Sequence, residues 1–303
     1  MSAAVIQSSH SDDFKKPQSA PRDYAFVREW NDAVRLAQQH WIWSYIMDEK
    51  YPLHPAAQAL VSADNPTREP VHIADVGCGN GTWLLDLYRK MPQTMCDKVF
   101  YVGTDLSSDY LPPTGDMPQN MTFSTLDLYG DMPADFIGKF DVVHIRMFAV
   151  VVKGNDPTSL LQNVVKMLKP GGILQWDEMA VASCRAIASI NGVSTMASEE
   201  WIKALFEKFK ISFDSSYEWI LHLSEYFETV GLKIVDSVHM ECPKELRRTM
   251  TSNIITASEN LSRSMSRDES WIGKWSAMMA EVNQGVCMVQ DTVMVVGQKP
   301  TIS

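Results

Sequence analysis

A cluster of glycines directly follows an apolar stretch in the segment 73–83, which reads IADVGCGNGTW. Glycine tolerates positive φ and lets the backbone approach a ligand closely, so this turn predicts a ligand site. A dinucleotide fingerprint would need glycine three residues after Gly79, where Thr82 stands instead. No Gly-Lys-Ser/Thr sequence follows, so the turn lacks the lysine that a nucleoside triphosphate site requires. The pattern therefore disfavours both NAD and ATP as the ligand.

Three carboxylates lie in or just after successive apolar segments: Asp75, Asp105 and Asp127. In open α/β folds, ligands bind at the carboxyl edge of the sheet. A carboxylate after the second segment can accept both hydroxyls of a ribose, and an acceptor after the third can take a hydrogen from an adenine amino group. A single aspartate is more often a helix cap or turn residue. Three in successive units favour a nucleoside site.

Further titratable groups follow the fourth and fifth expected strands. His144 and Arg146 flank the exit of the fourth, and Glu178 follows the fifth, so both groups are expected to border one chamber. For His144, a buried histidine hydrogen-bonded across the sheet explains the residue as well as a catalytic base does. An exposed loop carboxylate explains Glu178 equally well.

The elements that must position these residues alternate between strand and helix periodicity, which predicts a mainly parallel sheet covered on both faces. Long helical stretches at 23–60, 183–227 and 244–283 are expected to form a lid over the ligand end of the sheet. Residues 1–22 are polar and predict a disordered tail. The expected strands are 71–76, 99–104, 121–126, 140–145, 173–176, 232–238 and 288–296, and the expected short helices are 82–90 and 160–168.

Aromatic and methionine side chains are frequent in the helical stretches, and the chain contains 18 methionines. Such residues usually form core, but adaptable side chains over a ligand mouth would suit a flat, apolar acceptor. Gln39 and His40 could reach a ligand from the first stretch, although a solvated helix face explains them too. The aromatic and methionine residues are Met196, Trp201, Phe206, Phe209, Phe213, Trp219, Met250, Met265, Trp271, Trp275, Met278 and Met279.

Composition excludes several classes of protein. The 303 residues carry 27 basic and 37 acidic side chains, and the net charge of −10 opposes attraction to nucleic acid or to an anionic membrane. We see no apolar run long enough to span a bilayer and no signal peptide. Five cysteines without a CxxC pair argue against a disulfide framework and a zinc site. We therefore expect no metal, no nucleic acid and no membrane partner, and a reducing compartment: the cytoplasm, with the nucleus as the alternative.

The chain resembles the class I S-adenosylmethionine-dependent methyltransferases over roughly residues 27–182. DVGCGNG (75–81) matches their glycine motif, and LKPGGIL (168–174) matches the turn before their fifth strand. RLAQQH (35–40), GTDLS (103–107) and VHIR (143–146) resemble the fungal methyltransferases of secondary metabolism, including the LaeA-like group. This resemblance implies a Rossmann-like α/β fold with a seven-stranded sheet and helical lid insertions. The domains are then an N-terminal helical lid (23–68) and a methyltransferase domain (69–303), with insertions near 183–227 and 244–283.

The same resemblance assigns roles to residues of the edge. S-adenosylmethionine is the expected cofactor, with the glycine turn against its methionyl part and the aspartates on its amino group and adenosine. His144 and Glu178 are the expected catalytic candidates. The expected cofactor-binding residues are Asp75, Gly77, Cys78, Gly79, Thr82, Trp83, Asp105, Leu106, Asp127, Leu128 and Arg146.

The leading function is methylation of oxygen, nitrogen or sulfur on a small, fairly hydrophobic metabolite by direct in-line transfer. One alternative is a LaeA-like regulatory protein of secondary metabolism. Another is a cyclase that uses the positive charge of the cofactor without transferring its methyl group. The acceptor, the methylated atom and the oligomeric state do not follow from the sequence.

Overall fold

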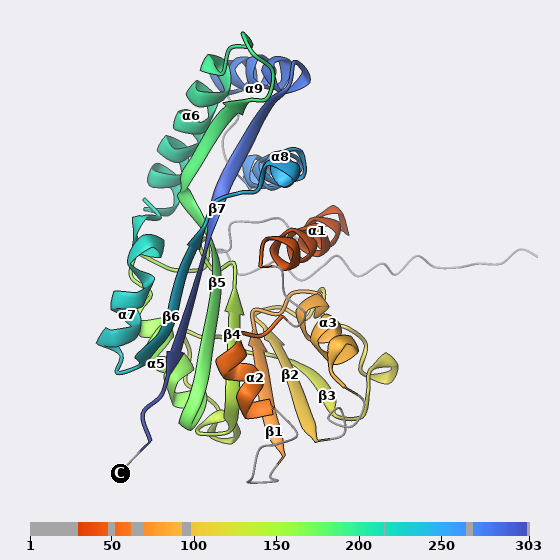
Figure 1. Ribbon diagram of the computed structural model, residues 1–303, viewed down its shortest axis with the longest axis vertical. Coiled ribbons are helices and arrows are strands. Elements are labelled where there is room, and N and C mark those ends of the chain that lie inside the picture. Colours follow the sequence, from red (N-terminus) through yellow and green to blue (C-terminus); the bar gives the residue numbers. More distant parts are fainter. Residues whose placement is uncertain are drawn as a thin grey trace, which may run out of the picture.

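The computed structural model describes residues 30–47, 52–61, 70–92, 98–214, 216–264 and 269–301. Its centre is a seven-stranded sheet in the order β3-β2-β1-β4-β5-β7-β6, in which β7 is antiparallel to both of its neighbours (Figure 1). The expected seven-stranded Rossmann-like sheet is confirmed. Its strands are β1 (Val71–Val76), β2 (Val99–Asp105), β3 (Met121–Thr125), β4 (Phe140–Arg146), β5 (Leu168–Ala188), β6 (Lys233–Met240) and β7 (Val286–Gln298).

Helices cover both faces of the sheet, as the alternation of periods predicts. A lid-forming group near the carboxyl ends of the strands includes α1, α6 and α8, while α2 and α3 lie on one face and α5 and α7 on the other (Figure 1). The α-helices are α1 (Trp30–Ile46), α2 (Pro55–Val61), α3 (Thr82–Lys90), α5 (Thr158–Met167), α6 (Met196–Phe213), α7 (Leu223–Thr229), α8 (Arg247–Ser264) and α9 (Glu269–Asn283). Short 3-10 helices are η1 (Thr114–Asp116), η2 (Ala134–Phe136), η3 (Glu218–His222) and η4 (Lys244–Leu246).

Two apolar cores hold these layers together. The smaller one packs α2 and α3 on the sheet through residues such as Leu53, Leu84 and Ile73. The larger one includes Val143, Trp176 and Trp201 and continues from the opposite face of the sheet to the helices of the lid. The burial of both faces explains why β1 and β4 read as nearly continuous apolar runs.

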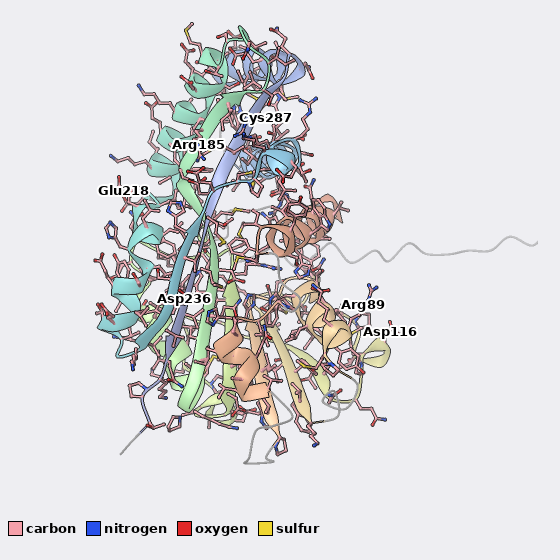
Figure 2. All side chains as sticks on the ribbon, in the orientation of Figure 1. Arg89, Asp116, Arg185, Glu218, Asp236 and Cys287 are labelled. Carbon is pink, nitrogen blue, oxygen red and sulfur yellow. The ribbon has the colours of Figure 1, made fainter. Side chains whose placement is uncertain are left out.

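Strand β5 is longer than the sequence indicates. Residues 183–188 were expected to begin a helical stretch, but they extend β5 and pair antiparallel with β7, from Arg185 opposite Val289 to Ala188 opposite Val286. The register shifts between Ala180 and Arg185, which marks a bulge in β5. Together β5 and β7 therefore form a two-stranded ribbon that rises beyond the sheet, and Arg185 and Cys287 lie on it (Figures 1 and 2).

The N-terminal stretch 23–60 contains two helices in its described part, α1 and α2, because Pro55 starts a new helix at its first position. The expected tail (1–22) and residues 23–29 lie outside the described residues. The domain boundaries stay a prediction. Over the described part of the chain, no helix is long and apolar enough to cross a membrane.

Candidate functional site

The glycine turn after β1 lies at the carboxyl edge of the sheet, as expected. Gly77, Gly79 and Gly81 have φ of 69°, 55° and 72°, values that side chains with a Cβ adopt at a cost. The Cys78 amide donates to the carbonyl of Thr104 over 2.8 Å, which ties the turn to β2. Burial raises the pKa of the Cys78 thiol, which is therefore neutral. The turn presents exposed backbone at Gly77 to the edge.

Asp105 ends β2 beside this turn. Its Oδ2 accepts the Gly79 amide at 3.0 Å, and its Oδ1 accepts the Ser107 amide at 3.2 Å. Each carboxylate oxygen has two lone pairs, so both oxygens can accept a further hydrogen bond from neighbouring ribose hydroxyls. Leu106 follows with 41% of its surface exposed, an apolar face next to a carboxylate. Such a donor-free, half-apolar edge fits an adenosine better than it fits a phosphate.

Asp127 lies after β3 and is exposed, and its Oδ1 accepts the Tyr129 amide at 2.9 Å in a turn. Its other oxygen accepts no hydrogen bond from the described residues. Leu128, the next residue, is buried in the larger core, so its own side chain anchors the loop that carries Asp127. The chemistry of the edge thus fits the expected cofactor: Asp105 and Leu106 would hold its ribose and adenine, and Asp127 the amino group of the base.

Asp75 and His144 do not face this edge. Both are buried, and His144 is completely enclosed: its Nδ1–H donates to Asp75 Oδ1 at 2.7 Å and its Nε2–H to Asp177 Oδ2 at 3.0 Å. Burial alone would lower the pKa of His144, but the hydrogen bonds to Asp177 and Asp75 outweigh it and raise the pKa. The arrangement therefore corresponds to a buried imidazolium between two carboxylates, not to an open catalytic base.

This buried triad involves two of the expected cofactor-binding residues. Asp75, expected on the cofactor amino group, binds His144. Trp83 is 2% exposed and stacks on His144 with ring centroids 3.8 Å apart and planes 3° apart. The pairing of β1 with β4 places Asp75 and His144 at opposite positions of neighbouring strands.

Thr82 stabilises the glycine turn through hydrogen bonds to Asn80. Its hydroxyl donates to Asn80 Oδ1 at 2.6 Å, and its amide donates to the same oxygen at 3.3 Å. The Asn80 side-chain amide in turn donates to the carbonyl of Ala33 in α1 at 3.4 Å. Thr82 thus fixes a side chain that links the glycine turn to the helix above it.

Helix α1 lies over the turn and is held there at its second half by Arg146. Arg146 Nη1 donates to His40 Nδ1 at 3.0 Å, and His40 Nε2–H donates to Asp86 Oδ2 of α3 at 3.0 Å. Burial, followed by the positive charge of Arg146, lowers the pKa of His40 to about 4 despite the bond to Asp86. His40 is therefore neutral near pH 7 and bridges β4 and α3, rather than lying on a solvated helix face.

A cavity of about 130 Å³ lies after the end of β4 and beside the middle of β5, between α1, α6 and α8. Most of its surface is apolar, with residues such as Leu36, Val181 and Leu205. Gln39 lines it and is buried, so this residue does not lie on a solvated helix face. A concave, largely apolar lining with a few polar groups is typical of a site for a small organic molecule.

Glu178 reaches this cavity from β5 and is fully buried, which excludes the exposed loop carboxylate. Its Oε2 accepts the Phe148 amide at 2.6 Å and the Trp176 indole N–H at 3.1 Å, and its Oε1 accepts the Met179 amide at 3.1 Å. Burial raises the pKa of Glu178 to about 8 although these donors oppose the shift. The group can therefore exchange a proton near neutral pH.

Sequence reasoning missed most of the cavity. The loop after β4 contributes Met147, which has a φ of 63°, and helix α8 contributes Asn253, Ile254 and Ser258. No motif marks these residues, and the packing of α8 against β7 and α1 brings them to the site. A non-glycine residue at positive φ beside a ligand site is a local strain that sequence patterns do not reveal.

The aromatic and methionine residues of the helical stretches are mostly core. Trp201, Met250 and Met278 are buried, Met196 is 65% exposed, and Phe209 lines the cavity. Met265 and the side chain of Phe213 lie outside the described residues. The usual structural explanation therefore holds for most of this group.

Comparison with known proteins agrees with this geometry. Residues 74–174 match the family described as "Methyltransferase domain". The chain is 28% identical to methyltransferase grgD of Penicillium sp over 151 residues, which are 49% of each chain. It is 27% identical to N-methyltransferase verN of Clonostachys rogersoniana over 159 residues, 52% of this chain and 50% of the relative.

A third relative has a regulatory name. The secondary metabolism regulator laeA of Coprinopsis cinerea is 31% identical over 150 residues, 50% of this chain and 33% of the relative. The chain thus spans about half the length of grgD and verN and a third of that of laeA. The family match covers the glycine turn and the exit of β4, and it ends within β5, before Glu178.

Proposed function

We propose that this chain, which carries a class I methyltransferase domain with S-adenosylmethionine as its cofactor, methylates a small, fairly hydrophobic metabolite of fungal secondary metabolism. One observation supports this most: a mostly apolar cavity with a buried carboxyl group meets the glycine turn at Leu36, which lines the cavity and would lie 3.2 Å from a Cβ at Gly79. Two neighbouring sites of different chemistry are what a transfer between a polar cofactor and an apolar acceptor requires.

The polar edge holds and orients the cofactor. Asp105 would accept from the ribose, Leu106 would pack on the adenine, Asp127 would accept from its amino group, and the exposed backbone at Gly77 would lie against the methionyl part. When bound, S-adenosylmethionine supplies an activated methyl group on a positively charged sulfur. Arg146 acts through His40 by holding α1 over the turn.

Glu178 is the proposed proton acceptor. In its ionised form, Oε1 takes the proton from the nucleophilic atom of the acceptor as that atom gains the methyl group. Three N–H donors fix the carboxyl group, so it does not have to reorient during the reaction. A pKa of about 8 leaves a useful ionised fraction at neutral pH and makes the group a sufficiently strong base.

The acceptor atom is oxygen, nitrogen or sulfur, and the similarity to the N-methyltransferase verN supports nitrogen. The name of laeA supports a second candidate function, a regulatory role in which the domain contributes to a protein complex. His144 has no part in the proposed chemistry because both of its nitrogens bind carboxylates inside the sheet.

The test is incubation of purified protein with methyl-labelled cofactor and a library of phenols, amines, amides and thiols. We expect label on one class of acceptor and an equal amount of demethylated cofactor. Cofactor binding without any labelled acceptor would refute the transferase. A stable protein partner in a pull-down, together with nuclear staining, would then favour the regulatory role over the cytoplasmic enzyme.

A further inference from the structure

Gln39 is an unusual residue of the cavity wall. Its side chain is 7% exposed, and its carboxamide makes no hydrogen bond to any residue in the described part of the chain. Its polar atoms are accessible rather than fully buried, so a molecule in the cavity can reach them. Since Gln39 lines the cavity, its partner is most simply a group of the bound molecule.

Helix α8 presents two further polar groups to the same cavity. Ser258 is 3% exposed, and among the described residues its hydroxyl has no partner. Asn253 donates through Nδ2 to the carbonyl of Arg35 at 3.3 Å and to Gln38 Oε1 at 3.0 Å, while its Oδ1 accepts from no described residue. A carboxamide, a hydroxyl and an amide oxygen thus line the cavity, contributed by α1 and α8.

The cavity carries little net charge. Arg35 lines it, but Arg35 Nε bonds to Asp32 Oδ1 at 2.7 Å, and both side chains are buried. Glu178 is mainly protonated at pH 7, because burial raises its pKa to about 8. An ion that enters such a space loses its hydration without gaining a counter-ion, which disfavours charged ligands.

The remaining wall is apolar apart from Gln290. It includes Val181 of β5, Leu205 and Phe209 of α6, and Ile254 and Leu261 of α8. This apolar surface can cover a ring system but offers it no hydrogen bond. The cavity wall therefore combines an apolar surface with a few neutral polar groups.

We propose that Gln39 selects the acceptor: it receives a neutral hydrogen-bonding group, of the amide or hydroxyl type, on an otherwise apolar and uncharged molecule. Gln39 supplies both a donor and an acceptor, and Ser258 and Asn253 can satisfy the remaining positions. The apolar wall holds the rest of the molecule. This inference rests on the proposed function only in assigning the cavity to the acceptor.

Three probes of similar shape test the proposal: indole-3-acetamide, indole-3-acetate and tryptamine, which are neutral, negative and positive. Their affinities are measured by calorimetry at pH 7 with S-adenosylhomocysteine present, for the wild type, Gln39→Leu and Gln162→Leu. Gln162 is an exposed glutamine of α5, remote from the cavity, and provides the matched control. If Gln39→Leu has a lowered Tm, it is replaced by Gln39→Met, whose side chain is closer to glutamine in shape.

We expect the acetamide to bind at least about ten-fold more tightly than either charged probe. Gln39→Leu should weaken the acetamide about ten-fold and leave S-adenosylhomocysteine affinity unchanged, and Gln162→Leu should change neither. Any of three results would overturn the proposal: the three probes bind with affinities within two-fold of one another, the acetamide binds Gln39→Leu as tightly as the wild type, or the acetamide does not bind. Failure of the proposed transferase function would give a different result: the neutral probe would bind selectively, but no acceptor would be methylated.

Discussion

The two neighbouring sites of this molecule are built in opposite ways. The cofactor edge is open, polar and made largely of backbone, and its carboxylate Asp105 is only partly buried. The acceptor cavity is mostly apolar, and its carboxyl group, Glu178, is completely buried. Burial raises the pKa of Glu178 to about 8, so this carboxyl group is mainly protonated at pH 7.

This difference shows that the environment of a carboxyl group determines its role. A half-solvated carboxylate is a permanent acceptor for hydroxyl groups, whereas a buried one becomes a group that gains and loses protons. A third case lies inside the sheet, where Asp75 and Asp177 hold a histidine between them. Three variants distinguish these cases, and we describe them from the largest expected effect to the smallest.

His144→Leu should have the largest effect, on stability. Removal of the imidazolium leaves Asp75 and Asp177 buried without their partner, and breaking such a pair costs about 3–5 kcal/mol. The free energy of unfolding, measured by urea titration monitored by circular dichroism, checks this. The matched control is His222→Leu, because His222 is 60% exposed and paired only with the exposed Glu225, so we expect a change below about 0.5 kcal/mol. A loss below about 1 kcal/mol in His144→Leu would contradict the charged triad.

Glu178→Gln should reduce kcat about 100-fold, because glutamine cannot accept the proton. Its single oxygen can still accept from Phe148 and Trp176, so cofactor affinity should not change. In the wild type, kcat should rise with pH up to about 8, and this limb of the profile should be absent in the variant. Retention of the same pH dependence in Glu178→Gln would assign the proton transfer to another group.

The raised pKa of Glu178 should also affect the stability of the folded protein. A pKa raised from 4.5 to about 8 means that the folded state holds a proton that the unfolded state has released between these values. The stabilisation is fully present below pH 4.5 and is lost as the pH rises through 8. Over this window, the wild type should therefore lose stability relative to Glu178→Gln.

Asp105→Ala should weaken S-adenosylhomocysteine by about 2 kcal/mol, roughly 30-fold in Kd, because the ribose loses a charged acceptor. The change lies at the partly exposed end of β2, so Tm should fall only slightly. Calorimetry checks both the variant and the control Asp116→Ala, an aspartate of η1 at the surface (Figure 2). Unchanged affinity in folded Asp105→Ala would remove the proposed ribose site.

The sequence allowed the cofactor edge to be predicted much better than the acceptor cavity. Asp105 and Asp127 follow strands whose apolar runs are easily recognised, and a parallel sheet necessarily brings the ends of such strands together. The cavity instead joins Leu36 to Gln290, and nothing local indicates which faces of α1 and α8 will meet. Burial also reversed the expected environment of Glu178, since its neighbours in the sequence do not reveal the depth of β5.

The long β5–β7 ribbon shows a second limit. Residues 183–188 have mixed polarity, and a helical interpretation was reasonable until β7 was available as a partner. Strand propensity depends on the neighbouring strand more than helix propensity depends on its surroundings. The short helix α3 was predicted with both ends correct, because a glycine turn starts it and its apolar face repeats locally.

The ribbon has a consequence for how the molecule can diversify. It carries Val181 and Gln290 to the cavity and supports α6, α8 and α9, yet it contributes nothing to the edge at Gly77 and Asp105 (Figure 1). Insertions or deletions in this ribbon would change the size of the cavity and leave the cofactor-binding edge unchanged. The range of acceptors could therefore change without loss of cofactor binding.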